Sequence, residues 1–122
     1  MKKTYLFAMA VAACFSAGGQ DRDFLPKAEM ETIASGKKWT FVRQDGSKIS
    51  WDMRSNGNLF ANNRTNGRND AGTWAVNEQG QLCTTWRGGS ANACFVVFKD
   101  GEKFKRALAS DAKGASDELT IE

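Results

Sequence analysis

Cys83 and Cys94 are the side chains of this chain best suited to chemistry, as a redox pair, a metal site or a disulfide. A redox-active pair is usually Cys-x-x-Cys with a lowered thiol pKa, whereas ten residues separate these two. A zinc site needs further thiolate or imidazole ligands, and the chain contains no histidine. An even pair in an oxidising compartment is typical of a disulfide. We therefore predict a structural bond that closes a loop of about twelve residues and contributes about 2–3 kcal/mol.

The lack of histidine also argues against catalysis. It excludes the Ser-His-Asp and Cys-His arrangements of nucleophilic enzymes. Asp45 and Asp100 fall in predicted turns and Asp52 on a solvent-facing strand position, where carboxylates are usually solvated. The Gly88-Gly89 pair has neither the lysine nor the strand-to-helix context of a phosphate-binding loop. We expect a protein that is not an enzyme and that carries no cofactor or metal.

The tryptophans suggest a binding function instead. All four fall on the apolar phase of a predicted strand: Trp39, Trp51, Trp74 and Trp86. Packing in a core explains this pattern. Alternatively, one or two of them line the mouth of an open barrel and stack on an apolar, sugar or peptide-like ligand. Four arginines could surround such a mouth: Arg54, Arg64, Arg68 and Arg87. The sequence leaves both interpretations open.

A polar stretch from Asn62 to Asp70 (NNRTNGRND) is the second candidate binding element. It faintly resembles a calcium loop, but Arg64 and Arg68 would place positive charge among the ligands. A polar hairpin loop is the simpler interpretation. If the domain contacts a protein partner, we expect six residues of this loop to do so: Asn62, Asn63, Arg64, Asn66, Arg68 and Asp70.

Residues 1–19 have the features of a bacterial signal peptide. Lys2 and Lys3 precede an apolar run from Leu6 to Ala13, and small residues follow. This run is shorter than the roughly 20 residues of a membrane-spanning helix. We therefore expect a periplasmic or secreted protein with no transmembrane segment in the mature chain. The tetrad that ends in Cys14 also resembles a lipobox, and lipidation there would instead anchor the protein to the outer membrane.

The charge balance argues against nucleic acid as a partner. The chain has 17 basic and 14 acidic residues, and the leader accounts for two of the basic ones, so the remainder is close to neutral. A nucleic-acid binder would be expected to carry a clustered basic excess. The basic residues are interleaved with acids and are interpreted as solvated surface charge; they include Lys37, Lys38, Arg64, Arg68, Lys103, Lys105 and Arg106.

About 100 residues remain after the leader, enough for one small domain. Residues 20–37 are predicted to be a lead-in and a short helix, with Pro26 near its start and Gly36 as its stop. From residue 38 the apolar period changes to two. Strands are predicted at 39–43, 48–54, 59–63, 73–77, 82–87, 93–99 and 103–109.

Short turns between these strands indicate a mainly β fold. We expect an antiparallel meander of about six to seven strands over residues 38–109, which forms a small barrel or half-barrel. Cys83 and Cys94 are equally distant from Gly88-Gly89, so they should lie opposite each other in a hairpin. Residues 110–122 are small, polar and acidic, and are predicted to be a flexible tail.

Several landmarks resemble a family of small secreted proteobacterial proteins of unknown function. The matching segments are LPKAEMETIASG (25–36), GTW (72–74), GQLC (80–83) with Trp86, ACFVVF (93–98) and the turn at Asp100-Gly101. The resemblance covers about residues 25–109 and implies a two-cysteine bridge in a compact β fold. It implies no activity and no catalytic residues.

The function predicted from the sequence is therefore binding. We expect an exported, non-enzymatic envelope protein that binds a small amphipathic ligand or another envelope protein. Two alternatives remain: an inhibitor or immunity-type protein that blocks an enzyme through an exposed loop, and a structural outer-membrane lipoprotein.

Overall fold

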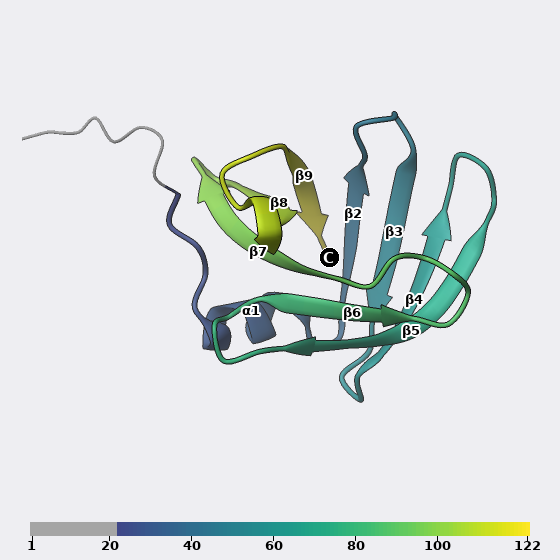
Figure 1. Ribbon diagram of the computed structural model, residues 1–122, viewed down its shortest axis with the longest axis horizontal. Helices are drawn as coiled ribbons and strands as arrows, with labels where there is room; N and C mark the ends of the chain where they lie inside the picture. Colours follow the sequence, from purple (N-terminus) through teal and green to yellow (C-terminus); the bar gives the residue numbers. More distant parts are fainter. Residues whose placement is uncertain (1–21) are drawn as a thin grey trace, which may run out of the picture.

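The structure, a computed structural model, describes residues 22–122. The predicted signal peptide (residues 1–19) and Cys14 lie outside the described residues. The elements run in the order α1 (Lys27–Ala34), β2 (Lys37–Val42), β3 (Lys48–Met53), β4 (Asn58–Asn63), β5 (Asn69–Val76), β6 (Leu82–Trp86), β7 (Ala93–Asp100), β8 (Lys103–Leu108), the 3-10 turn η3 (Ala109–Asp111) and β9 (Ser116–Ile121) (Figure 1).

The short helix α1 forms where the sequence predicts it. Pro26, with φ −72°, precedes the first helical residue, and Gly36, with φ +72°, lies just beyond the end, where the left-handed region favours glycine. Met30 and Ala34, one turn apart, are fully buried. The indole Nε1 of Trp39 donates to the carbonyl oxygen of Ile33 at 2.7 Å and so ties the helix to the sheet.

Eight antiparallel strands of the described chain form a closed barrel in sequence order. Local turns make this order possible, because each strand pairs with the next one along the chain. The predicted mainly β meander with one short helix is confirmed, and the number of strands is corrected from six or seven to eight. Within residues 22–122, no helix has the length and apolar character needed to cross a bilayer.

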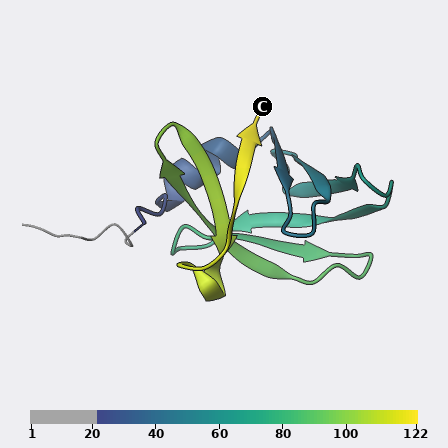
Figure 2. The same ribbon diagram turned by 90° about the horizontal axis from the view of Figure 1, so that it is seen from above.

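The additional strand is β9, and the predicted flexible tail is wrong over this segment. β9 pairs with β8 on one side and with β2 on the other, where Trp39 lies opposite Ile121. Figure 2 shows β9 (yellow) between β8 and β2. Leu119 is buried in the core, whereas the preceding inward position is occupied by Asp117. This charge at an inward position interrupts the apolar alternation and conceals the strand in the sequence.

Cys83 and Cys94 lie directly opposite each other on β6 and β7, and their sulfurs are at bonding distance. The predicted register and pairing are therefore confirmed. Only three residue pairs join β6 to β7, compared with six between β7 and β8. The bond thus fastens the shorter of these two strand pairings.

The two ends of the barrel differ. Because neighbouring strands are antiparallel, alternate turns gather at the same end, and Figure 1 shows α1 at the end opposite the turns that follow β2 and β4. The α1 end is filled by a buried apolar cluster that includes Met30, Ala34, Trp39, Met53, Leu59, Leu82, Val97 and Leu119. The other end carries the candidate site.

Candidate functional site

A cavity of about 500 Å³ lies at the end of the barrel opposite α1. An eight-stranded barrel is just wide enough to be filled by side chains or to hold one small ligand. Here the wall contains four aromatic side chains, and the rim contains exposed residues of the β4–β5 and β6–β7 loops. The aromatic residues of the wall are Phe41, Trp51, Trp86 and Phe95. A cavity that combines an aromatic wall with several polar groups can hold a small amphipathic molecule.

Trp51 is the centre of this aromatic wall. Its ring centroid lies 5.2 Å from that of Phe41, 5.7 Å from that of Trp86 and 5.4 Å from that of Phe95. Its ring also stacks on that of Trp39, on the side toward α1, with 6.2 Å between the centroids. Such mutual packing fixes the orientation of the rings, because each ring restricts the rotamers of its neighbours.

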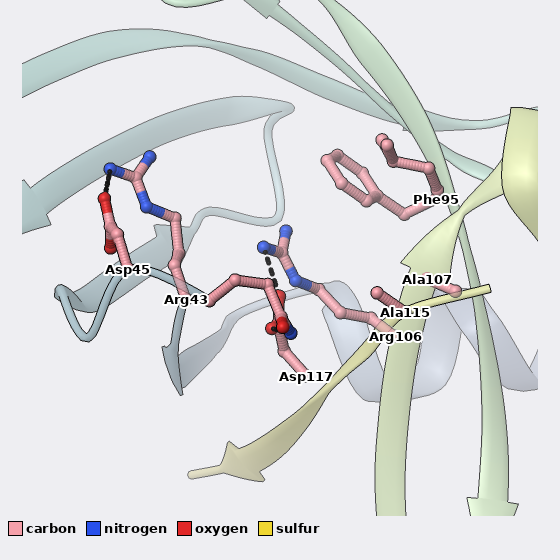
Figure 3. Close-up of a pocket in the computed structure, with 9 residues that line it drawn as sticks. Arg43, Asp45, Phe95, Arg106, Ala107, Ala115 and Asp117 are labelled. Carbon is pink, nitrogen blue, oxygen red and sulfur yellow. Dashed lines mark hydrogen bonds and ion pairs between the residues drawn. The ribbon is translucent and has the colours of Figure 1, made fainter.

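A charged residue lies among these rings. Arg106, on β8, is only 6% exposed, and its Cζ lies 3.6 Å from the ring centroid of Phe41 and 4.5 Å from that of Phe95. Its Nη2 donates to Oδ2 of Asp117 on β9 at 3.0 Å. Figure 3 shows the guanidinium between the ring of Phe95 and the carboxylate of Asp117. The predicted solvated role of Arg106 is therefore wrong.

Arg106 has hydrogen-bond donors that the described part of the chain leaves unpaired. Its Nε and Nη1 are buried and meet no acceptor from residues 22–122. A buried donor without an acceptor costs about 1–3 kcal/mol. Burial lowers the pKa of Arg106 to about 10, against the raising effect of Asp117, so the guanidinium stays cationic at neutral pH.

A second cavity of about 390 Å³ reaches Arg106 from the side of the β2–β3 and β8–β9 turns. Both cavities are lined by Arg43, Phe95, Arg106 and Leu108. Figure 3 shows the side chain of Arg43 directed toward Asp45, with which it pairs at 3.4 Å. Arg106 therefore lies at the base of two adjoining openings.

Asp70 fastens the β6–β7 loop at the rim. Its carboxylate accepts from the amide of Gly88 at 2.8 Å and from the Ser90 hydroxyl at 2.6 Å, with a longer bond from the Ser90 amide. The Ser90 hydroxyl, together with the amides of Ala71, Gly88 and Ser90, holds the pKa of Asp70 below its ordinary value. This carboxylate thus fixes one side of the opening.

Replacing Asp70 by alanine should release this loop without unfolding the barrel. The amides of Gly88 and Ser90 should exchange with solvent about tenfold faster, as measured by NMR hydrogen exchange. Because the folded pKa of Asp70 is lowered, the contact is complete above its unfolded pKa and is lost as the pH falls through the folded value. Asp45→Ala, which removes a similar acceptor from the β2–β3 turn, should leave both exchange rates unchanged.

The structure separates the four tryptophans into two pairs. Trp51 and Trp86 line the larger cavity, as one interpretation of the sequence proposed for one or two of them. Trp39 is fully buried against α1. The Trp74 indole donates to the carbonyl oxygen of Arg54 at the end of the barrel away from the larger cavity. These two tryptophans pack the closed half of the barrel.

The proposed rim arginines and partner loop are only partly brought together. Arg68 lines the larger cavity, whereas Arg54 lies at the other end of the barrel beside Asp52. Arg64 and Arg87 are exposed and do not line it. Four of the six residues of the predicted partner loop line the larger cavity, namely Asn63, Asn66, Arg68 and Asp70, and the Asn62 side chain pairs with Asn69.

The sequence interpretation missed Arg106, Asp117, Phe41 and Phe95 as site residues. A signal for Arg106 was present, because it shares the inward phase of β8 with Phe104 and Leu108. A single charged residue at an inward strand position indicates one of two things. Either a β-bulge shifts the alternation there, or the charge is buried and has a partner. The partner, Asp117, lay in the segment predicted to be a tail.

A family model described as "Protein of unknown function (DUF995)" matches residues 4–111. This span includes α1 and all strands from β2 to β8. The expected resemblance to a family of unknown function is confirmed to that extent. Neither a curated protein nor a solved structure matches the chain.

Proposed function

We propose that this chain, which belongs to the DUF995 family of proteins of unknown function, binds one small amphipathic ligand at the open end of its barrel. One observation carries the proposal: a cavity of about 500 Å³ with an aromatic wall at the end that α1 does not fill. Cavities of about 300–1,000 Å³ with mostly apolar walls and a few polar groups are typical of ligand sites.

The proposed activity is binding without catalysis. The chain has no histidine, and the acids near the cavity are already engaged: Asp70 with the β6–β7 loop, Asp117 with Arg106 and Asp45 with Arg43. The proposed location is the periplasm or the extracellular space, with a lipid anchor at Cys14 as the alternative. The signal-like residues 1–19 and the Cys83–Cys94 bond support the proposed location outside the cytoplasm.

An uncharged fluorescent probe tests the proposal. N-Phenyl-1-naphthylamine brightens in apolar surroundings, and we expect a saturable, one-to-one rise in its fluorescence with the purified protein. Ala61→Phe should weaken this binding by about tenfold or more, because Ala61 lines the cavity and the added ring would occupy it.

Ala75→Phe is the matched control, because Ala75 is exposed on β5 and does not line the cavity. It adds the same volume and should bind the probe as the unmodified protein does. The proposal fails if the unmodified protein shows no saturable binding, or if both substitutions weaken binding equally.

A further inference from the structure

The charges around the cavity favour an anion. Of the described residues that line the larger cavity, three are cationic, Arg43, Arg68 and Arg106, and one is anionic, Asp70. The carboxylate of Asp70 is already surrounded by the Ser90 hydroxyl and by the amides of Gly88, Ser90 and Ala71. A cationic ligand would therefore meet arginines and find no acid free to pair with it.

Arg106 is the group best placed to hold an anion. It has only donors, and Nε and Nη1 have no acceptor among residues 22–122. Asp117 does not compensate further, because one of its oxygens accepts from Arg106 and the other from the Gln44 amide at 3.4 Å. The ring centroids of Phe41, Trp51 and Phe95 lie 3.6–5.0 Å from the guanidinium carbon, and Arg106 also lines both cavities.

Burial strengthens such a contact. Hydrogen bonds to an ionised partner are stronger than neutral ones, and a low local dielectric increases the attraction further. Arg43 lies in the linings of both openings together with Arg106, so an anion there would also offset the repulsion between the two cations.

We propose that the ligand is a small organic anion, with its apolar or aromatic body against Trp51 and Trp86 and its anionic group on Arg106. This inference rests on the proposed function and narrows it to one ligand class. It also assigns Arg106 as the residue that sets specificity, since the aromatic wall alone would accept neutral molecules equally well.

A pair of probes that differ only in charge tests the inference. 2-Naphthoate and 2-naphthamide have nearly the same shape, and the first is anionic at neutral pH. By isothermal titration calorimetry, we expect the unmodified protein to bind the naphthoate at least about tenfold more tightly than the amide.

The paired substitution Arg106→Gln/Asp117→Asn removes both charges and leaves two side-chain amides that are able to hydrogen-bond, which should preserve folding. This variant should bind both probes with nearly the affinity of the unmodified protein for the amide. Arg54→Gln is the control, because it removes one arginine at the far end of the barrel and should keep the preference for naphthoate. Thermal unfolding of each variant verifies that it is folded.

Each outcome decides a different point. Equal binding of the two probes by the unmodified protein, or a preference that survives in the paired variant, would overturn the inference and leave the proposed function standing. Binding of neither probe would overturn both.

Discussion

Asp117→Leu is expected to lower the free energy of unfolding by about 3–5 kcal/mol, because it leaves Arg106 as a buried cation without its carboxylate. The side chains of Arg106 and Asp117 are 8% and 15% exposed, so water replaces little of the lost interaction. The measurement is urea denaturation followed by tryptophan fluorescence, with the slope compared between variants.

A double substitution distinguishes the effect of losing the whole Arg106–Asp117 ion pair from the effect of leaving Arg106 without its partner. Arg106→Met/Asp117→Leu removes both charges and fills the space with apolar groups, and should recover most of the lost stability. Glu118→Leu is the control from the same strand, since Glu118 is half exposed and pairs with exposed Lys103, and should change stability by no more than about 1 kcal/mol. A loss for Glu118→Leu as large as that for Asp117→Leu would contradict the assignment.

Removing residues 116–122 should abolish cooperative folding. The truncated chain would lose the buried Leu119 and the carboxylate of Asp117, and would leave β2 and β8 as unpaired edges. We expect the near-ultraviolet circular dichroism signal of the packed tryptophans to disappear and the NMR amide dispersion to collapse.

The matched control changes the outward face of the same strand. Glu118→Ala/Thr120→Ala alters two exposed side chains and keeps the backbone pairs, so its spectra should match those of the unmodified protein. If the truncated chain unfolds with the same cooperativity as the full chain, β9 is dispensable and the barrel does not depend on its closure.

The parts of the fold that depend on local pattern were predictable. Ile49, Trp51 and Met53 alternate with polar residues, and Asp45-Gly46 supplies a turn, so β3 and its hairpin follow from neighbours in sequence. The Cys83–Cys94 pairing followed from the position of one turn.

The site depended on contacts between distant parts of the chain. Arg106 and Asp117 interrupt the apolar face of their own strands, and each is explained only by the other. Alternation placed all four tryptophans on inward faces. It could not show that Trp39 would meet α1 while Trp51 would face an open cavity, because that division depends on which end of the barrel the helix covers.

This division of the interior has a consequence for protein engineering. The side chains that hold the barrel together cluster around α1, whereas Ala61, Asn63, Ala93 and Leu108 line the unfilled half. Combinatorial libraries at these four positions can therefore diversify the proposed ligand site while the packed side chains around α1 stay unchanged. Arg106 is the exception, because it forms the buried ion pair with Asp117 and is also the proposed ligand contact, so the two residues have to be varied together.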